Sequence, residues 1–224
     1  GIVEVFGLDK TWIAFIPGII IAFFVYKFLP KIQTKPLSYK LGDIFRVLAN
    51  NTNLMITLIP LIIIRSFIMT ALLTYLPFYW INHHQVSVLT VGIVMSLASI
   101  FGGFFSIYGG WLSEKIGEKS ILIGSFLLSA PLLLSSLYFI SYQQIVSFAF
   151  FILGFSILGS TISLNIVQAQ RVISDYKGII SGITGGFCWG VASLLMYPTG
   201  LFINNFSYFS VLSIIIFIIF FNLI

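Results

Sequence analysis

Residues 54–81 read LMITLIPLIIIRSFIMTALLTYLPFYWI, and this stretch decides the fold class. A membrane-spanning helix needs about 20 mostly apolar residues, because each residue adds roughly 1.5 Å and the hydrocarbon core is about 30 Å thick. The stretch meets this requirement, and Arg65 is its one charged residue. It therefore predicts a transmembrane helix that carries a positive charge inside the membrane.

Similar apolar stretches lie on both sides of this one. Together they occupy residues 12–29, 54–81, 86–112, 120–140, 144–167, 179–203 and 208–224. Of the 224 residues, 59% are hydrophobic and 8% are charged, whereas a soluble domain has about 25% charged residues. Such a chain cannot cover a soluble surface with polar groups. We therefore predict an all-α membrane protein with about seven transmembrane helices and the lipid bilayer as its main partner.

Basic residues alternate between the links that join these stretches. Lys and Arg occur in the links around 27–46, 113–119 and 171–177, whereas the links 82–85, 141–143 and 204–207 contain none. Because cytoplasmic links are enriched in Lys and Arg, the N-terminal residues are expected outside and the C-terminus in the cytoplasm. Orientation in the membrane explains the net charge of +5, so nucleic acid is not an expected partner. The expected location is the inner membrane of a bacterium.

A long polar stretch, residues 31–53, separates one apolar stretch from the six that follow. We expect residues 1–30 to contain the last helix of an N-terminal half, residues 31–53 to form a cytoplasmic linker, and residues 54–224 to form a six-helix domain. The chain begins with Gly1 and is still hydrophobic at residues 214–224. We therefore expect it to be a fragment of a longer protein.

A short motif follows the third apolar stretch: GGWLSEKIGEK, residues 109–119. It resembles the signature of the major facilitator superfamily, in which a glycine, an acid, a base and a second glycine precede basic residues. The matching residues are Gly110, Glu114, Lys115, Gly117 and Lys119. The resemblance implies a helical bundle of that superfamily, here helix six plus the C-terminal six-helix half. It also implies that the signature residues act in gating between two halves.

Other residues resemble the fosmidomycin-resistance branch of this superfamily, whose members are proton-driven exporters of small drugs. The resemblance lies in residues 65–77, 169–170 and 185–190. Two positions depart from the pattern: Glu118 stands where the family normally has a basic residue, and Arg171 where the branch usually has Glu. The resemblance implies a secondary transporter that exports a small drug or metabolite by proton-coupled alternating access.

Polar residues inside the apolar stretches are the candidates for a substrate cavity. They are Arg65, Thr70, Thr74, Thr161, Asn165 and Gln168. A charge deep in a membrane helix is costly and normally faces a cavity or a partner. Arg65 is therefore interpreted either as a contact for an anionic substrate or counter-ion, or as a structural ion pair or a side chain that reaches water. The last three residues share one helix face, which lines a cavity or bonds to neighbouring helices.

Glycines recur at four-residue spacing in the sixth apolar stretch. They are Gly178, Gly182, Gly186 and Gly190. A second stripe of glycines and serines runs through residues 92–110. Small residues on one face let membrane helices approach closely, so both stripes predict helix packing. The alternative is a moving interface that also serves transport.

Several residue types are absent from the places where they would be needed for other functions. The apolar stretches contain no Asp or Glu, so a proton relay is expected in an N-terminal half outside this chain. No catalytic, metal-ligand or cofactor motif occurs, so we expect no enzyme activity, no metal and no cofactor. The alternative function is a polytopic membrane enzyme or assembly factor without transport activity.

Overall fold

The computed structural model describes residues 12, 15–28, 49, 51–52, 54–173 and 176–223. The chain divides into two units, Gly1–Asp43 and Ile44–Ile224. The first contains the apolar helix α2 (Phe15–Phe28), which falls within the predicted stretch 12–29. Most of the predicted linker 31–53 lies outside the described residues, as do the N-terminal residues before Trp12.

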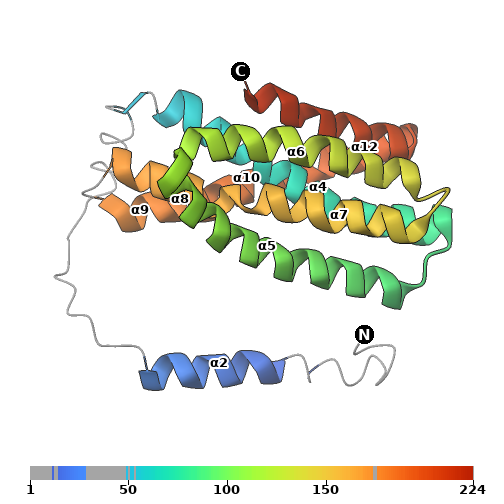
Figure 1. Ribbon diagram of the computed structural model, residues 1–224, viewed down its shortest axis with the longest axis horizontal. Coiled ribbons are helices and arrows are strands. Elements are labelled where there is room, and N and C mark those ends of the chain that lie inside the picture. The colour runs from blue at the N-terminus through green and yellow to red at the C-terminus, as the bar shows by residue number, and fades with distance from the viewer. Residues whose placement is uncertain are drawn as a thin grey trace. The chain divides into compact units, whose positions relative to one another are not determined.

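The second unit is a bundle of long helices joined by short links (Figure 1). Its first three helices are α4 (Ile59–His84), α5 (Val88–Ile116) and α6 (Glu118–Phe139). A fourth span consists of α7 (Gln144–Gly159) and α8 (Thr161–Val172). A fifth consists of α9 (Lys177–Ser181), a π-helical stretch Gly182–Phe187, α10 (Cys188–Leu194) and α11 (Met196–Asn205). The last helix is α12 (Tyr208–Phe217).

Five spans among the described residues are long and apolar enough to cross a membrane, and two shorter apolar helices accompany them. The shorter ones are Phe15–Phe28 and Tyr208–Phe220. All of these elements correspond to the seven predicted stretches, and the described residues form no β-strand. The prediction of an all-α membrane protein is confirmed.

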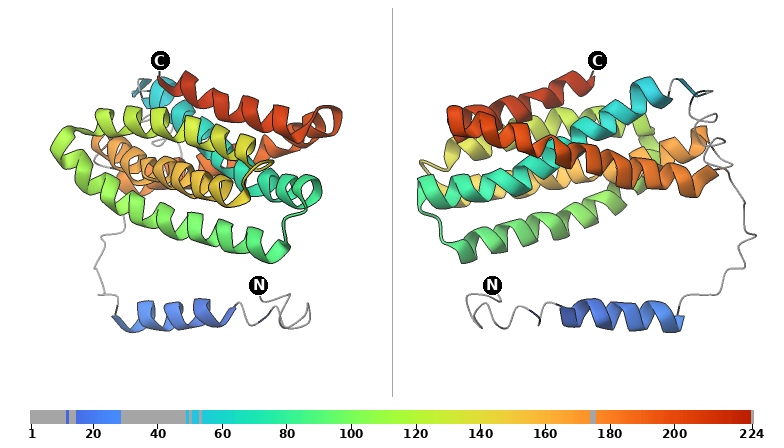
Figure 2. Two further views of the ribbon diagram at one scale, coloured as in Figure 1. Left: turned by 45° about the vertical axis from the view of Figure 1, so that its right-hand side comes forward. Right: turned by 180° about the vertical axis from the view of Figure 1, so that it is seen from behind.

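Local sequence explains where several helices begin and end. Ser87 caps the start of α5 by accepting a hydrogen bond from the Thr90 N–H at 3.1 Å. Helix α4 ends at Gln85, which is left-handed with φ 55°, and the Val86 N–H then donates to the Trp80 carbonyl at 3.1 Å. This is the hydrogen bond of a Schellman motif. These short caps turn the chain back within a few residues, so neighbouring spans run in opposite directions (Figure 2).

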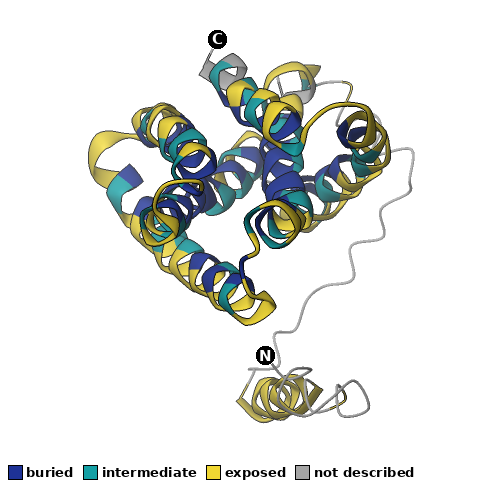
Figure 3. Cartoon of the chain, turned by 90° about the vertical axis from the view of Figure 1, so that its right-hand side faces the viewer, coloured by how far each residue is buried: buried dark blue, intermediate teal, exposed yellow. Residues whose placement is uncertain are grey.

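Apolar side chains fill the interior of the second unit. Helix α7 packs against both α5 and α6, and α4 packs against α10 and α12. The largest core side chains include Trp80, Phe126 and Phe151, each 1% exposed or less. Seen along the bundle, buried residues turn toward its middle and exposed ones form its outer faces (Figure 3). Dispersion contacts of this kind, rather than a difference in water affinity, hold helices together in lipid.

Small residues bring α5 close to the fourth span. A Cβ added at Gly109 would lie 2.9 Å from the Ser160 Cβ, and one added at Gly159 would lie 3.4 Å from the Gly102 Cα. The Ser163 hydroxyl donates to the Ser106 carbonyl of α5 at 3.0 Å. The two helices therefore touch through bare backbone and a hydroxyl hydrogen bond.

Helix α5 is longer than its predicted stretch. The apolar pattern stops at Leu112, but the backbone hydrogen bonds continue through Ser113, Glu114 and Lys115 to Ile116. The link to α6 is Gly117 alone, with a φ of 89° that glycine adopts without strain. The predicted signature link is therefore mostly the last turn of a helix, because charged side chains can extend beyond the membrane while their backbone stays helical.

Candidate functional site

Arg65 lies in the interior of the bundle. Its side chain is 1% exposed, which excludes in this conformation a side chain that reaches water. The Nη2 group donates to the Ser66 hydroxyl at 3.2 Å, and the guanidinium lies 6.0 Å from the centre of the Trp189 ring on α10. Its Nε and Nη1 atoms have no hydrogen-bond partner among the described residues. Each such unmet buried donor costs about 1–3 kcal/mol.

The other candidates on α4 have a different environment. Thr70 is half-buried, and its hydroxyl donates to the Ser66 carbonyl at 2.8 Å. Thr74 is exposed. The Thr70 hydroxyl is therefore used by its own helix, whereas the Thr74 side chain lies on an outer face.

The predicted polar face of α8 is largely buried. Thr161 and Asn165 are both 0% exposed, and Gln168 is half-buried. The Thr161 hydroxyl donates to the Leu158 carbonyl at 2.7 Å. Neither the oxygen nor the nitrogen of the Asn165 amide has a hydrogen-bond partner in the described part of the chain. Asn165 and Arg65 are thus both buried with unmet hydrogen-bonding groups.

The signature residues lie where α5 meets α6. Glu114 and Lys115 are exposed on the last turn of α5, Gly110 is half-buried, and Lys119 is exposed on the first turn of α6. The Lys115 ammonium lies 3.8 Å from the centre of the Trp111 ring, within the range of a cation–π contact. These exposed charges stand at the end of the bundle, free to meet groups beyond it.

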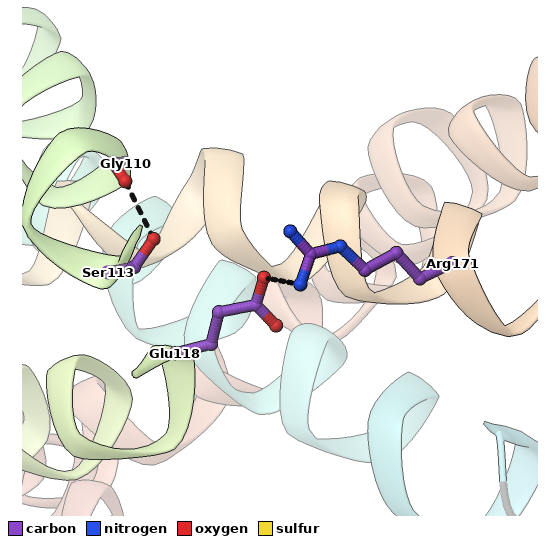
Figure 4. Close-up of polar contacts among 4 residues, drawn as sticks. All are labelled: Gly110, Ser113, Glu118 and Arg171. Atoms are coloured by element: carbon purple, nitrogen blue, oxygen red, sulfur yellow. Dashed lines mark hydrogen bonds and ion pairs between the residues drawn. The ribbon is translucent and has the colours of Figure 1, made fainter. Parts of the chain in front are cut away.

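An ion pair that was not predicted joins this junction to α8. The Arg171 Nη1 lies 2.5 Å from the Glu118 Oε1, while the Ser113 hydroxyl donates to the Gly110 carbonyl at 2.7 Å (Figure 4). Glu118 is 17% exposed and Arg171 67% exposed. The pair fastens the start of α6 to the end of α8 at one end of the bundle.

The predicted glycine stripe of the fifth span lies open. A Cβ added at any of its four positions would meet no atom of the described residues within 4 Å. These positions are Gly178, Gly182, Gly186 and Gly190. Positions 92, 103 and 110 of the α5 stripe are equally open. Neither stripe packs against a helix of this bundle, and their role as packing faces stays a prediction.

A groove lies elsewhere on the bundle, between α4, α11 and α12. Its volume is about 510 Å³, and its lining includes Phe67, Pro198, Phe202 and Ile214. None of the predicted cavity residues lines it. Its apolar walls suit hydrocarbon, and they contain no charged group that could select a polar ligand.

The sequence as a whole matches a known family. A family model described as Major Facilitator Superfamily matches residues 2–197. The chain belongs to the Major Facilitator Superfamily. The predicted family and the helical-bundle fold class are both confirmed, and the family is one of transporters rather than enzymes.

Two relatives within this superfamily illustrate the similarity. One is an uncharacterized MFS-type transporter, YfnC, of Bacillus subtilis (strain 168), 25% identical over 134 residues, which cover 57% of this chain and 30% of the relative. The other is the Fosmidomycin resistance protein of Escherichia coli (strain K12), 27% identical over 154 residues, which cover 67% of this chain and 36% of the relative. The chain spans about a third of the length of these curated relatives.

The Glu118–Arg171 pair explains the two departures from the superfamily pattern. Glu118 replaces a usual base and Arg171 replaces a usual acid, and the structure pairs these two side chains with each other. The complementary signs were the signal in the sequence that could have predicted the contact. The other contacts that sequence reasoning missed, such as the Gln170 amide donating to the Ser181 hydroxyl at 2.6 Å, have no comparable signal.

Proposed function

We propose that this chain is the C-terminal part of a secondary active transporter that exports a small drug or metabolite by proton-coupled alternating access. Membership of the superfamily supports membrane transport. Similarity to the Fosmidomycin resistance protein supports export of a small drug. In this proposal, residues 1–30 hold the last helix of the N-terminal half, residues 31–53 link the halves, and residues 54–224 form the C-terminal transport domain.

The open small-residue faces carry this proposal. Glycine costs helix stability, about 1 kcal/mol relative to alanine, so a regular glycine stripe needs a structural reason. In lipid that reason is close approach of another helix. The stripes on α5 and on the fifth span face no described helix. A second helical half that slides on these faces would give them the contact that their spacing predicts.

The remaining candidates take their roles from this arrangement. The buried polar residues on α4 and α8 would face the substrate path between the halves. Glu114 and Lys115 extend from the same helix as the open α5 face, where they would gate by contacting the other half. Since the apolar spans lack Asp and Glu, a carboxylate relay for protons would come from another part of the protein.

The charge distribution supports an orientation in a bacterial inner membrane. Lys115, Lys119, Arg171 and Lys177 all lie at the ends of helices that meet at one end of the bundle. The opposite end, with the links after α4, α6 and α11, has no Lys or Arg in those links. By the positive-inside rule the basic end is cytoplasmic. The N-terminal residues would then lie outside and the C-terminus inside.

Expression of the full coding sequence in a bacterium that lacks its own drug exporters tests this function. We expect a several-fold rise in the fosmidomycin concentration that stops growth. In proteoliposomes we expect drug transport that depends on an imposed pH gradient. A protein that is inserted and folded but moves no drug, with or without the gradient, would contradict the proposal. Transport without dependence on the gradient would remove only the proton coupling.

A further inference from the structure

Two buried side chains in this bundle have hydrogen-bonding groups with no partner. Arg65 leaves Nε and Nη1 unpaired, and Asn165 leaves both amide atoms unpaired, among the residues that the structure describes. Both side chains are at most 1% exposed. Buried hydroxyls nearby, such as that of Thr161, donate to a backbone carbonyl instead. The unmet groups are therefore not a general property of polar residues in this core.

Arg65 and Asn165 lie at about the same depth on facing helices. Ile62 on α4 and Ala169 on α8 belong to one buried cluster. Arg65 follows Ile62 by three residues and Asn165 precedes Ala169 by four, so each lies on the same helix face as its neighbour in the cluster. Since the two spans run in opposite directions, these steps of about 4.5 and 6 Å lead the same way along the bundle.

We propose that Arg65 and Asn165 together bind an oxyanion, so that the substrate carries a carboxylate or phosphate group. This inference rests on the transport function proposed above and adds the substrate's charge to it. A guanidinium presents its N–H groups as a planar fork that matches two oxygens of such an anion. The Asn165 amide adds a further donor. An oxyanion thus satisfies the unmet donors and neutralises the buried charge in one step.

Access to Arg65 is controlled by α10. Its guanidinium lies beside Trp189, and Cys188, the first residue of α10, belongs to the same buried cluster as Ile62. Directly before α10 comes the π-helical stretch Gly182–Phe187, which includes three glycines. π-Helical turns often mark functional sites within helices. Displacement of α10 at this stretch uncovers the guanidinium and admits the anion.

Trp189 gives the experiment a spectroscopic reporter. The full-length protein is purified in detergent and titrated with sodium phosphate, and separately with sodium acetate, at constant ionic strength set by sodium chloride. We expect a saturable change in tryptophan fluorescence that disappears in Trp189→Phe. Arg65→Gln should weaken the binding at least tenfold, Asn165→Leu several-fold, and Arg65→Lys less than Arg65→Gln. Lys177→Gln, which removes an exposed positive charge, should bind as the wild type does.

The outcomes separate a free anion from an internal counter-ion. If neither probe gives a saturable signal that depends on Arg65, a carboxylate of the protein itself occupies the site and the proposal is overturned. Equal affinity in the wild type and in Arg65→Gln overturns it as well. Arg65→Lys keeps the charge, so partial binding in this variant shows that loss in Arg65→Gln is not loss of folding.

A transport measurement distinguishes this inference from the proposed function. If the wild type exports a drug and Arg65→Gln exports it equally well, the transport function stands and the anion site is wrong. If phosphate binds through Arg65 but the protein transports nothing, the binding site stands and the transport function is wrong. Export of anionic compounds that is lost in Arg65→Gln supports both.

Discussion

Small residues line two kinds of helix face in this bundle, one closed and one open. At the closed contact, Gly109 and Gly159 let α5 touch the fourth span so closely that an added Cβ would meet atoms at 2.9 and 3.4 Å. At the open face, Gly186 and Gly190 have no described atom within 4 Å of such a Cβ. The same residue type thus serves contact within the bundle in one place and leaves a bare surface in the other.

This difference teaches what glycine spacing can and cannot indicate. A stripe at spacings of three and four shows that one helix face is bare of side chains. It does not say which helix comes close. The partner is set by topology, and α5 demonstrates this because its Gly103 face is open while its Gly109 face, on the same helix, is closed.

The largest expected effect comes from filling the closed contact. Gly109→Leu places a side chain against Ser160 on α8's neighbouring turn, where even a Cβ is too close. Overpacking of a tight contact costs about 1–3 kcal/mol, so we expect a clear fall in the midpoint of thermal unfolding in detergent. Gly103→Leu is the matched control, since its Cβ meets nothing within 4 Å. Equal destabilisation by both substitutions would remove the distinction between the faces.

The open face should respond in the opposite way. Gly190→Leu should leave the thermal stability of this bundle near that of the wild type, because no described atom is near. If another helical half slides on this face, the same substitution should lower transport at least tenfold, which corresponds to about 1.4 kcal/mol. Gly190→Ala adds only a methyl group and should cost much less. Wild-type transport by Gly190→Leu would argue that lipid, not protein, covers this face.

The comparison also explains how much of the fold could be predicted. Composition and helix length were enough for an all-α membrane protein, because lipid permits few other structures. The end of α5 was predicted one turn early, since charged residues such as Glu114 end the apolar pattern without ending the helix. The closed contact at Gly109 could not be chosen over the open stripe, because the sequence does not give the partner of a face.

The candidate site was predicted in part and for a similar reason. Arg65 and Asn165 were selected because a polar residue is costly inside a membrane helix, and the structure locates both in the buried interior. That their hydrogen-bonding groups are left unmet depends on which side chains surround them. Thr70 and Thr161 looked equivalent in the sequence, yet their hydroxyls bond to their own helix. Residue type indicates the cost of burial, whereas only packing shows whether that cost is offset.

The smallest expected effect concerns the ion pair at the closed end of the bundle. Glu118→Lys or Arg171→Glu replaces the Glu118–Arg171 attraction with repulsion between α6 and α8. Because Arg171 is 67% exposed, solvent screens the pair, and each reversal should cost about 0.2–1 kcal/mol in thermal unfolding. The double reversal restores opposite charges with the signs usual in the superfamily. It should therefore recover most of the loss, with the difference shrinking at high salt. If the double variant is no more stable than the single ones, the two departures from the family pattern are independent, and proximity alone explains their contact.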